Sequence, residues 1–279
     1  MQLRHLPFVF ITVLLGSCLQ ETDIPLKESS WVVEGLILDE EIATVNLTIV
    51  TPKDGAELIF CPDNEVSKLI QLEKINDRTE VLQSTDPFRG AYQSDSIIGE
   101  FNRDYTLRVD IGDDLPTIIG QTKMPKYKLE IDSVRLIPSL NPQGSIIINS
   151  LKLFFKPLPE TNIFVRVLVS SNFNGLTAAD AIVTPEIFIR GEDLAKDDWS
   201  YTWRANRQLF EDSVTIKTFV MEEAVWEYLD FIRLAQTQTI DETFNISLAP
   251  TDKRKANLTG DILGYFAAMT TDTLDVLIQ

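Results

Sequence analysis

Polar and apolar residues alternate along most of this chain, which is the pattern of β-strands with one buried and one solvated face. Between residues 105 and 111, for example, Tyr105, Leu107, Val109 and Ile111 share one side and polar residues occupy the other. Similar segments predict strands at 31–38, 43–50, 56–61, 90–92, 128–136, 145–155, 162–170 and 187–190. The pattern therefore predicts a mainly β protein.

One segment departs from this alternation. Between residues 221 and 237, apolar residues recur at helical spacing, and mostly charged residues fall between them. The apolar positions are Met221, Val225, Tyr228, Leu229, Ile232 and Ala235. We predict an amphipathic helix over 221–237 that packs on a sheet.

Met124-Pro125 divides the run of predicted strands in two. Short strands with turn signals between them predict an N-terminal immunoglobulin-like β-sandwich over 28–124. The remaining residues, 125–279, are predicted to form a second β-rich domain that carries the helix. With 44% hydrophobic residues, the chain has enough apolar side chains for a buried core and is not predicted to be disordered.

The N-terminus has the pattern of a secretory signal, which we place at 1–17. Arg4 precedes a short, largely apolar stretch at 8–15, and small residues lead to Cys18. A membrane-spanning helix would need about 20 apolar residues, more than this stretch provides. The remaining alternatives are an ordinary signal peptide with an incidental cysteine, or a signal in which Cys18 itself marks the cleavage point.

We favour the second alternative, because the run that ends at Cys18 resembles the lipobox of bacterial lipoproteins. The resemblance implies a diacylglycerol on Cys18, cleavage before it, and acylation of its new amino group by a fatty acid such as palmitate. Several acyl chains hold a protein on a membrane, whereas a single chain does not. Residues 18–27 then form a polar, acidic tether, similar to the export signal of Bacteroidetes surface lipoproteins. The expected location is the outer membrane, lipid-anchored and exposed at the cell surface.

Composition excludes several functions. The chain carries 25 Lys and Arg against 42 Asp and Glu, a net charge of −17, so we expect no nucleic-acid partner. The single histidine, His5, lies in the signal, which excludes a mature Ser-His-Asp triad and a histidine-ligated metal site. Cys61 follows a predicted strand and is interpreted as a buried apolar residue. We predict no catalytic residues, no enzyme activity, no metal site and no cofactor.

Trp199, Tyr201 and Trp203 form the sharpest local pattern that suggests a binding site. On a strand these three aromatic side chains share one face, and such a face can stack on a sugar ring or a peptide side chain. The alternative is that they belong to the core and that the polar face, with Thr202 and Arg204, meets water. We favour a position in the core, and keep Trp199, Tyr201 and Trp203 as candidate ligand-binding residues. Acidic groups at 39–41, 110–114 and 192–198 offer oxygen ligands for Ca²⁺, but without EF-hand spacing they are better interpreted as solvated turns.

Several short motifs, taken in order, resemble an uncharacterised family of Bacteroidetes outer-membrane lipoproteins that is defined only as a domain of unknown function. Besides the lipobox these are Val32-Val33-Glu34-Gly35, Gly90-Ala91-Tyr92 with Tyr105-Thr106-Leu107, Trp226-Glu227-Tyr228-Leu229, Asn257-Leu258-Thr259-Gly260, and Gly264-Tyr265-Phe266-Ala267. The chain departs from the family pattern at Asp261, which stands in place of a glycine.

The resemblance implies two β-rich domains on the cell surface or in the periplasm, and a role beside a TonB-dependent outer-membrane transporter as an accessory or ligand-capture protein. No catalytic residue is implied, and the ligand is not identified. A second possibility is a structural or adhesive, fimbrillin-like lipoprotein that exchanges an edge strand, for which 273–278 is a candidate. A third and weaker alternative is a carboxylate-based glycosidase.

Overall fold

The computed structural model describes residues 30–53, 55–60, 69–86, 90–112, 116–140, 144, 146–172, 186–204, 213–238, 257–260 and 262–277. Within these residues the chain is built mostly of strands with two helices, which confirms the predicted β-rich fold. The predicted signal at 1–17, the tether at 18–27, Cys18 and Cys61 lie outside the described residues.

The elements follow one another with few helices between them. The strands are β1 (Ser30–Leu38), β2 (Ile42–Lys53), β3 (Gly55–Phe60), β4 (Leu69–Lys74), β5 (Arg78–Val81), β6 (Gln83–Asp86), β7 (Ala91–Ile98), β8 (Asp104–Asp110), β9 (Ile118–Lys123), β10 (Ile131–Leu140), β11 (Ile146–Phe155), β12 (Phe164–Asn172), β13 (Glu186–Arg190), β14 (Ser200–Arg204), β15 (Ser213–Met221) and β16 (Leu263–Leu277). The helices are α1 (Gly191–Lys196) and α2 (Glu223–Gln238).

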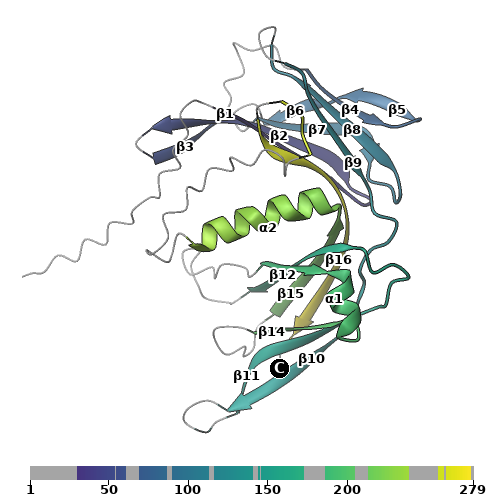
Figure 1. Cartoon of the computed structure of the whole chain (residues 1–279), viewed down its shortest axis with the longest axis vertical. Coiled ribbons are helices and arrows are strands. Elements are labelled where there is room, and N and C mark those ends of the chain that lie inside the picture. Colours follow the sequence, from purple (N-terminus) through teal and green to yellow (C-terminus); the bar gives the residue numbers. More distant parts are fainter. Residues whose placement is uncertain are drawn as a thin grey trace, which may run out of the picture.

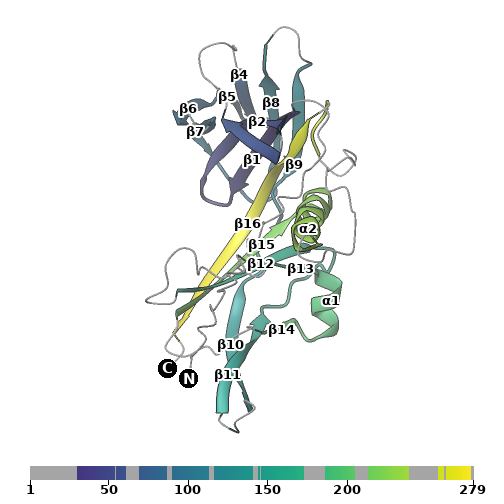
Figure 2. The ribbon, with the colours of Figure 1, turned by 90° about the vertical axis from the view of Figure 1, so that its left-hand side faces the viewer.

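A nine-stranded sheet runs through the molecule in the order β13-β12-β15-β16-β1-β2-β7-β6, with β3 also paired to β2. Its longest strand, β16, pairs with β1 in parallel through 263–269 and with β15 antiparallel through 270–277. Figures 1 and 2 show β16 as the strand that joins the two ends of the molecule. The C-terminal strand therefore crosses the boundary that the sequence places at Met124-Pro125.

The N-terminal end of the molecule is sandwich-like. The strands β1, β2 and β7 of the large sheet face a second, four-stranded sheet in the order β5-β4-β8-β9. Their alternating apolar residues meet in one core, which includes Val33, Leu47, Leu72 and Leu107. Phe266 from β16 is also fully buried in this core. The sandwich-like N-terminal end is thus completed by a strand from the far end of the chain.

At the other end of the molecule, β12, β15 and β16 pack against a three-stranded sheet, β10-β11-β14. Leu151, Leu153, Val165 and Ile216 lie in the core between these layers. The hydroxyl of Thr218 is also buried here, and donates to the carbonyl of Leu129 at 2.8 Å, so this polar group does not lose its hydrogen bond on burial.

The predicted amphipathic helix is confirmed as α2, which covers the opposite face of the large sheet (Figure 1). Val225 and Tyr228, two of the predicted apolar positions, are buried. The indole of Trp226 donates to the carbonyl of Val165 at 3.0 Å, and its ring lies 5.7 Å from that of Phe164. A hydrogen bond and an aromatic contact therefore fix α2 on β12.

Several elements have no counterpart in the sequence prediction. The strands β5 (RTEV) and β6 (QSTD) are short and mostly polar, so they carry no apolar alternation. Helix α1 is only six residues long. The predicted strand at 128–136 begins later, at Ile131, because the preceding segment crosses from β9 to β10.

Candidate functional site

The aromatic triplet that the sequence nominates for ligand binding lies in the core. Trp199 is 9% exposed and Trp203 is 7% exposed, and Tyr201 packs against the same cluster. Trp199 also precedes β14, with a positive φ of 53°, rather than lying on the strand. The two indole rings are therefore not available to stack on a ligand, which corrects the binding hypothesis in favour of the core interpretation.

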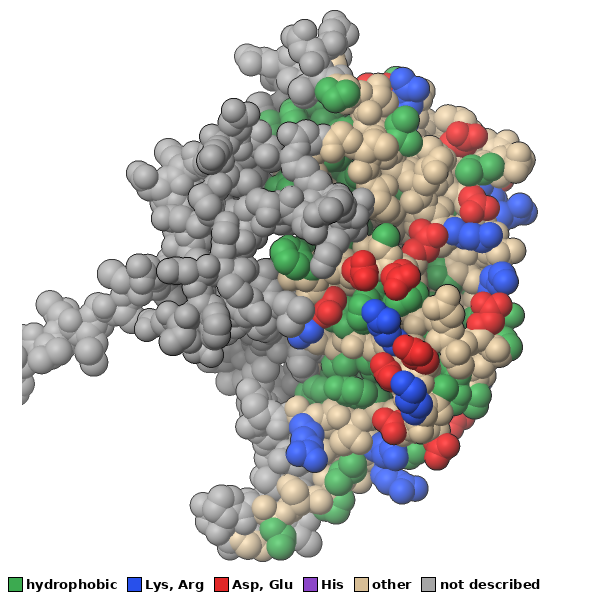
Figure 3. All heavy atoms as spheres, in the orientation of Figure 1, with side chains coloured by type: hydrophobic (Ala, Val, Ile, Leu, Met, Phe, Trp, Pro, Cys, Tyr) green, Lys and Arg blue, Asp and Glu red, His purple; other side chains and the backbone are tan. Residues whose placement is uncertain are grey.

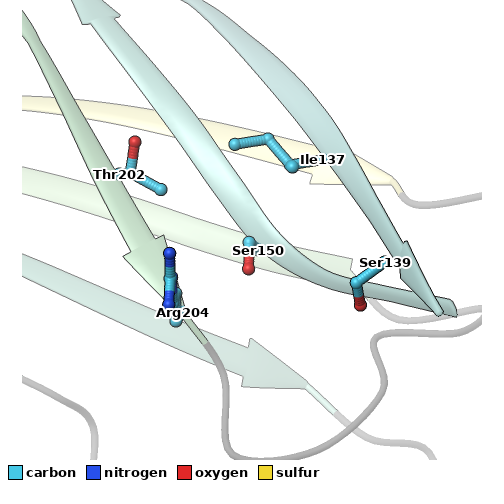
Figure 4. Close-up of a pocket in the computed structure, with 5 residues that line it drawn as sticks. All are labelled: Ile137, Ser139, Ser150, Thr202 and Arg204. Atoms are coloured by element: carbon cyan, nitrogen blue, oxygen red, sulfur yellow. The ribbon is translucent and has the colours of Figure 1, made fainter. Parts of the chain in front are cut away.

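The opposite face of the same strand borders a pocket. It has a volume of about 260 Å³ and is lined by Ile137 and Ser139 of β10, Ser150 of β11, and Thr202 and Arg204 of β14. Figure 4 shows these side chains converging from three neighbouring strands. The pocket thus combines three hydroxyl groups and one guanidinium with the apolar side chain of Ile137.

Strand register explains why these side chains meet. Ser150 is opposite Ile137 in β10 and opposite Arg204 in β14, so the three project from one row of the sheet. The register of β10 against β11 shifts between Ile137 and Pro138, a β-bulge that bends the strand locally. We attribute the hollow at the end of this sheet to that bend.

The next row of the same face is cationic. Arg135, Lys152 and Thr202 are cross-strand neighbours. The guanidinium of Arg135 lies 5.7 Å and the ammonium of Lys152 lies 5.2 Å from the ring centroid of Phe154, so both cations contact the same aromatic ring. Among the described residues, neither they nor Arg204 form an ion pair with a carboxylate.

Several motifs that carry the family resemblance come together elsewhere, where β1 and β16 pair. Glu34 is in register with Tyr265, and Gly35 with Phe266. A Cβ atom on Gly35 would lie 2.6 Å from the ring of Phe266 and 3.2 Å from the side chain of Leu107. Close packing of Gly35 against Phe266 and Leu107 therefore accounts for the glycine in the motif Val32-Val33-Glu34-Gly35.

Asn257 has an equally structural role. Its side-chain amide donates to the carbonyl of Phe266 at 2.5 Å and accepts from the amide of Phe266 at 3.0 Å. It also donates to the carbonyl of Gln121 at 2.9 Å, which ties β9 to β16. The asparagine motif is thus a cross-link between strands.

Glu34 is the motif residue that packing does not explain. It projects from β1 on the side of α2, near the hydroxyl groups of Tyr228 and Tyr265, whose rings are 5.9 Å apart. The residue as a whole remains exposed, but the surrounding protein removes part of the hydration of its carboxyl, which raises the pKa of Glu34. Burial, reinforced by the charge of Glu34, raises the pKa of Tyr265 to about 12.

We expect Glu34→Gln to stabilise the protein at neutral pH. Because the folded-state pKa of Glu34 lies above its unfolded value of 4.5, its contribution to stability is present below that value and is lost as pH rises through the folded pKa. The gain from the substitution should therefore appear at pH 7 and vanish near pH 4. Urea midpoints at the two pH values measure it, with the exposed Glu73→Gln as control. A gain that is equal at both pH values would contradict the assignment.

A second cavity of about 390 Å³ lies at the junction of the two ends of the molecule. Lys126 and Glu160 form an ion pair at 3.3 Å beside it, and Thr122 donates to Glu222 at 3.0 Å. Lys126 and Glu160 are thus paired with each other and Glu222 is bound to Thr122, which favours a structural role at this junction.

The acidic groups considered for calcium do not converge in the described part of the chain. No three Asp, Glu, Cys or His residues are grouped there as metal ligands. Asp39 instead accepts from the backbone amide of Thr271 at 2.5 Å, and Asp193 pairs with Lys196 at 2.9 Å. Asp113 and Asp114 lie outside the described residues. Neither of the two described helices is long and apolar enough to span a bilayer.

Comparison with known proteins adds no assignment. No protein-family model matches the sequence, and no curated protein matches it significantly.

Proposed function

We propose that the protein is a lipid-anchored binding protein of a bacterial outer membrane, exposed at the cell surface, that captures a ligand for a TonB-dependent transporter. The observation that carries the proposal is the position of Cys18 directly after a short apolar stretch and small residues. This arrangement specifies an anchor of several acyl chains rather than a membrane-spanning helix.

The described fold is compatible with capture by non-covalent contacts. The pocket on β10, β11 and β14 offers hydroxyl groups and Arg204 at the surface of a rigid sheet. Binding groups held on regular strands keep their geometry better than groups on loops, and so lose less entropy when a ligand binds. Histidine, the commonest general base, is absent from the sequence after residue 5.

Labelling of the expressed chain with radioactive palmitate tests the anchor. We expect label on the natural protein and on Ser17→Ala, and complete loss of label and of membrane sedimentation in Cys18→Ser. Retention of label in Cys18→Ser would overturn the proposed anchor.

Detergent extraction through a C-terminal tag, followed by mass spectrometry, tests the partner. A stoichiometric TonB-dependent transporter is the expected co-purifying protein. Recovery of the protein alone, or only as its own polymer, would overturn the accessory role and favour the adhesive alternative.

One observation weighs against the adhesive alternative. The candidate exchange strand at 273–278 falls largely within β16, which pairs with β15 from Thr270 to Leu277. The same strand continues from the part of β16 that completes the N-terminal core. A subunit that surrendered it would expose both cores, so we assign this strand to the closure of its own sheet.

A further inference from the structure

We infer that the pocket on β10, β11 and β14 is a binding site for the oxyanion group, carboxylate or phosphate, of a small soluble ligand. This inference rests on the proposed function, since it names the class of ligand that the binding protein takes. The observations behind it do not involve the lipid anchor, because they concern only one face of the β10-β11-β14 sheet.

The sign of the charge reverses locally at this pocket. The chain as a whole has a net charge of −17. On the face of the molecule shown in Figure 3, cationic and anionic side chains are interspersed. By contrast, the pocket and the row beside it contribute Arg204, Arg135 and Lys152, for which the described residues provide no carboxylate partner. A cationic site on an acidic protein attracts small anions locally while the rest of the surface repels them.

The hydrogen-bond donors of the pocket match the geometry of an oxyanion. Arg204 presents a planar fork of donors, which suits the two oxygens of a carboxylate or phosphate. The hydroxyl of Thr202 is on the same strand and the hydroxyls of Ser139 and Ser150 are on the neighbouring strands, within the same pocket. Hydroxyl groups donate to anionic oxygens and accept from ligand hydroxyls, so the lining suits an anion carried on a polar ligand.

The pocket is small. The volume of about 260 Å³ lies just below the range of about 300–1,000 Å³ that is usual for drug-sized ligands. A pocket of this size holds one anionic group with a single small ring or short chain. Phe154 does not offer a free stacking face, because Arg135 and Lys152 both contact its ring. Charge and hydrogen bonds, rather than ring stacking, therefore determine the ligand.

The test is calorimetric titration of the full chain in neutral detergent with glucuronate, inorganic phosphate and glucose, the neutral counterpart of glucuronate. We expect at least one of the two anions to bind and glucose not to bind, with an affinity that falls as salt is raised. Arg204→Gln should weaken binding at least tenfold. The matched control Arg78→Gln removes the same charge from an exposed arginine of β5 and should change binding less than twofold.

Two variants make the result specific. Arg204→Lys keeps the charge but loses the fork, so we expect intermediate binding. Lys152→Gln, in the adjacent row, should weaken binding by a smaller factor than Arg204→Gln. These side chains lie on an outer sheet face, so the variants are expected to keep the fold, which circular dichroism checks.

Three outcomes would overturn the inference. Equal binding of glucose and glucuronate would show that the charge is not recognised, and equal effects of Arg204→Gln and Arg78→Gln would show that only net charge matters. Binding of the Cys18→Ser protein, which lacks the proposed anchor, to vesicles that contain anionic lipid, with no binding of either soluble anion, would assign the face to the membrane instead. None of these outcomes depends on a transporter or on membrane anchoring, so failure of the proposed function remains distinguishable.

Discussion

Gly264→Ala is expected to destabilise the protein by about 3–5 kcal/mol, which is a large part of the about 5–15 kcal/mol that a domain has in total. Gly264 has a φ of 112°, in a region that residues with a Cβ atom rarely adopt. A Cβ atom at this position would also overlap the carbonyl oxygen of Val33 on β1. Because β1 and β16 pair in parallel here, relief of the overlap would separate the strands that join the two ends of the molecule.

Gly260→Ala is the matched control for this prediction. Gly260 also has a positive φ, 90°, but a Cβ atom there would meet nothing within 4 Å. Its substitution should show the cost of backbone strain alone, about 1–3 kcal/mol. Urea unfolding of the two variants separates the two causes. If both lose the same stability, close approach of β1 is not what requires glycine at position 264.

The contrast between these two glycines shows what the sequence can and cannot predict. Both are glycines of the C-terminal motifs, and nothing local in the sequence distinguishes them. The parallel pairing of β1 with β16 joins residues more than two hundred positions apart, and no periodicity in either strand specifies its partner. Local patterns such as the alternation in β8 and the helical spacing in α2 were sufficient, because each reports the burial of one face of one element.

The candidate pocket could not be predicted from the sequence for the same reason. The alternation in β14 places aromatic side chains on one face and Thr202 and Arg204 on the other, and this division holds in the structure. The aromatic residues suggested a binding face, but that face lies in the core, because burial of a large apolar surface is the stronger demand. The pocket itself depends on β10 and β11, so its presence follows from strand register rather than from any one segment.

Asn257→Ala is expected to cost about 2–4 kcal/mol. The side chain of Asn257 satisfies both the amide and the carbonyl of Phe266, a residue that is fully buried, and the carbonyl of Gln121. Its removal leaves these backbone groups without partners in the described structure, and each unsatisfied buried group costs about 1–3 kcal/mol. The loss should appear as a lower urea midpoint, together with faster hydrogen exchange at the amide of Phe266.

Asn46→Ala supplies the comparison, because Asn46 is an exposed asparagine on β2. We expect this substitution to change stability by no more than about 0.5 kcal/mol. Asn257→Asp sharpens the test: it keeps the shape and the acceptor but faces two carbonyl oxygens with a carboxylate in place of the donor. It should therefore destabilise at least as much as alanine at neutral pH and recover partly in acid, when a protonated carboxyl can donate again. A cost for Asn257→Ala no greater than that for Asn46→Ala would mean that β9 and β16 are held together by packing of Leu258 and Phe266 alone, and not by the asparagine cross-link.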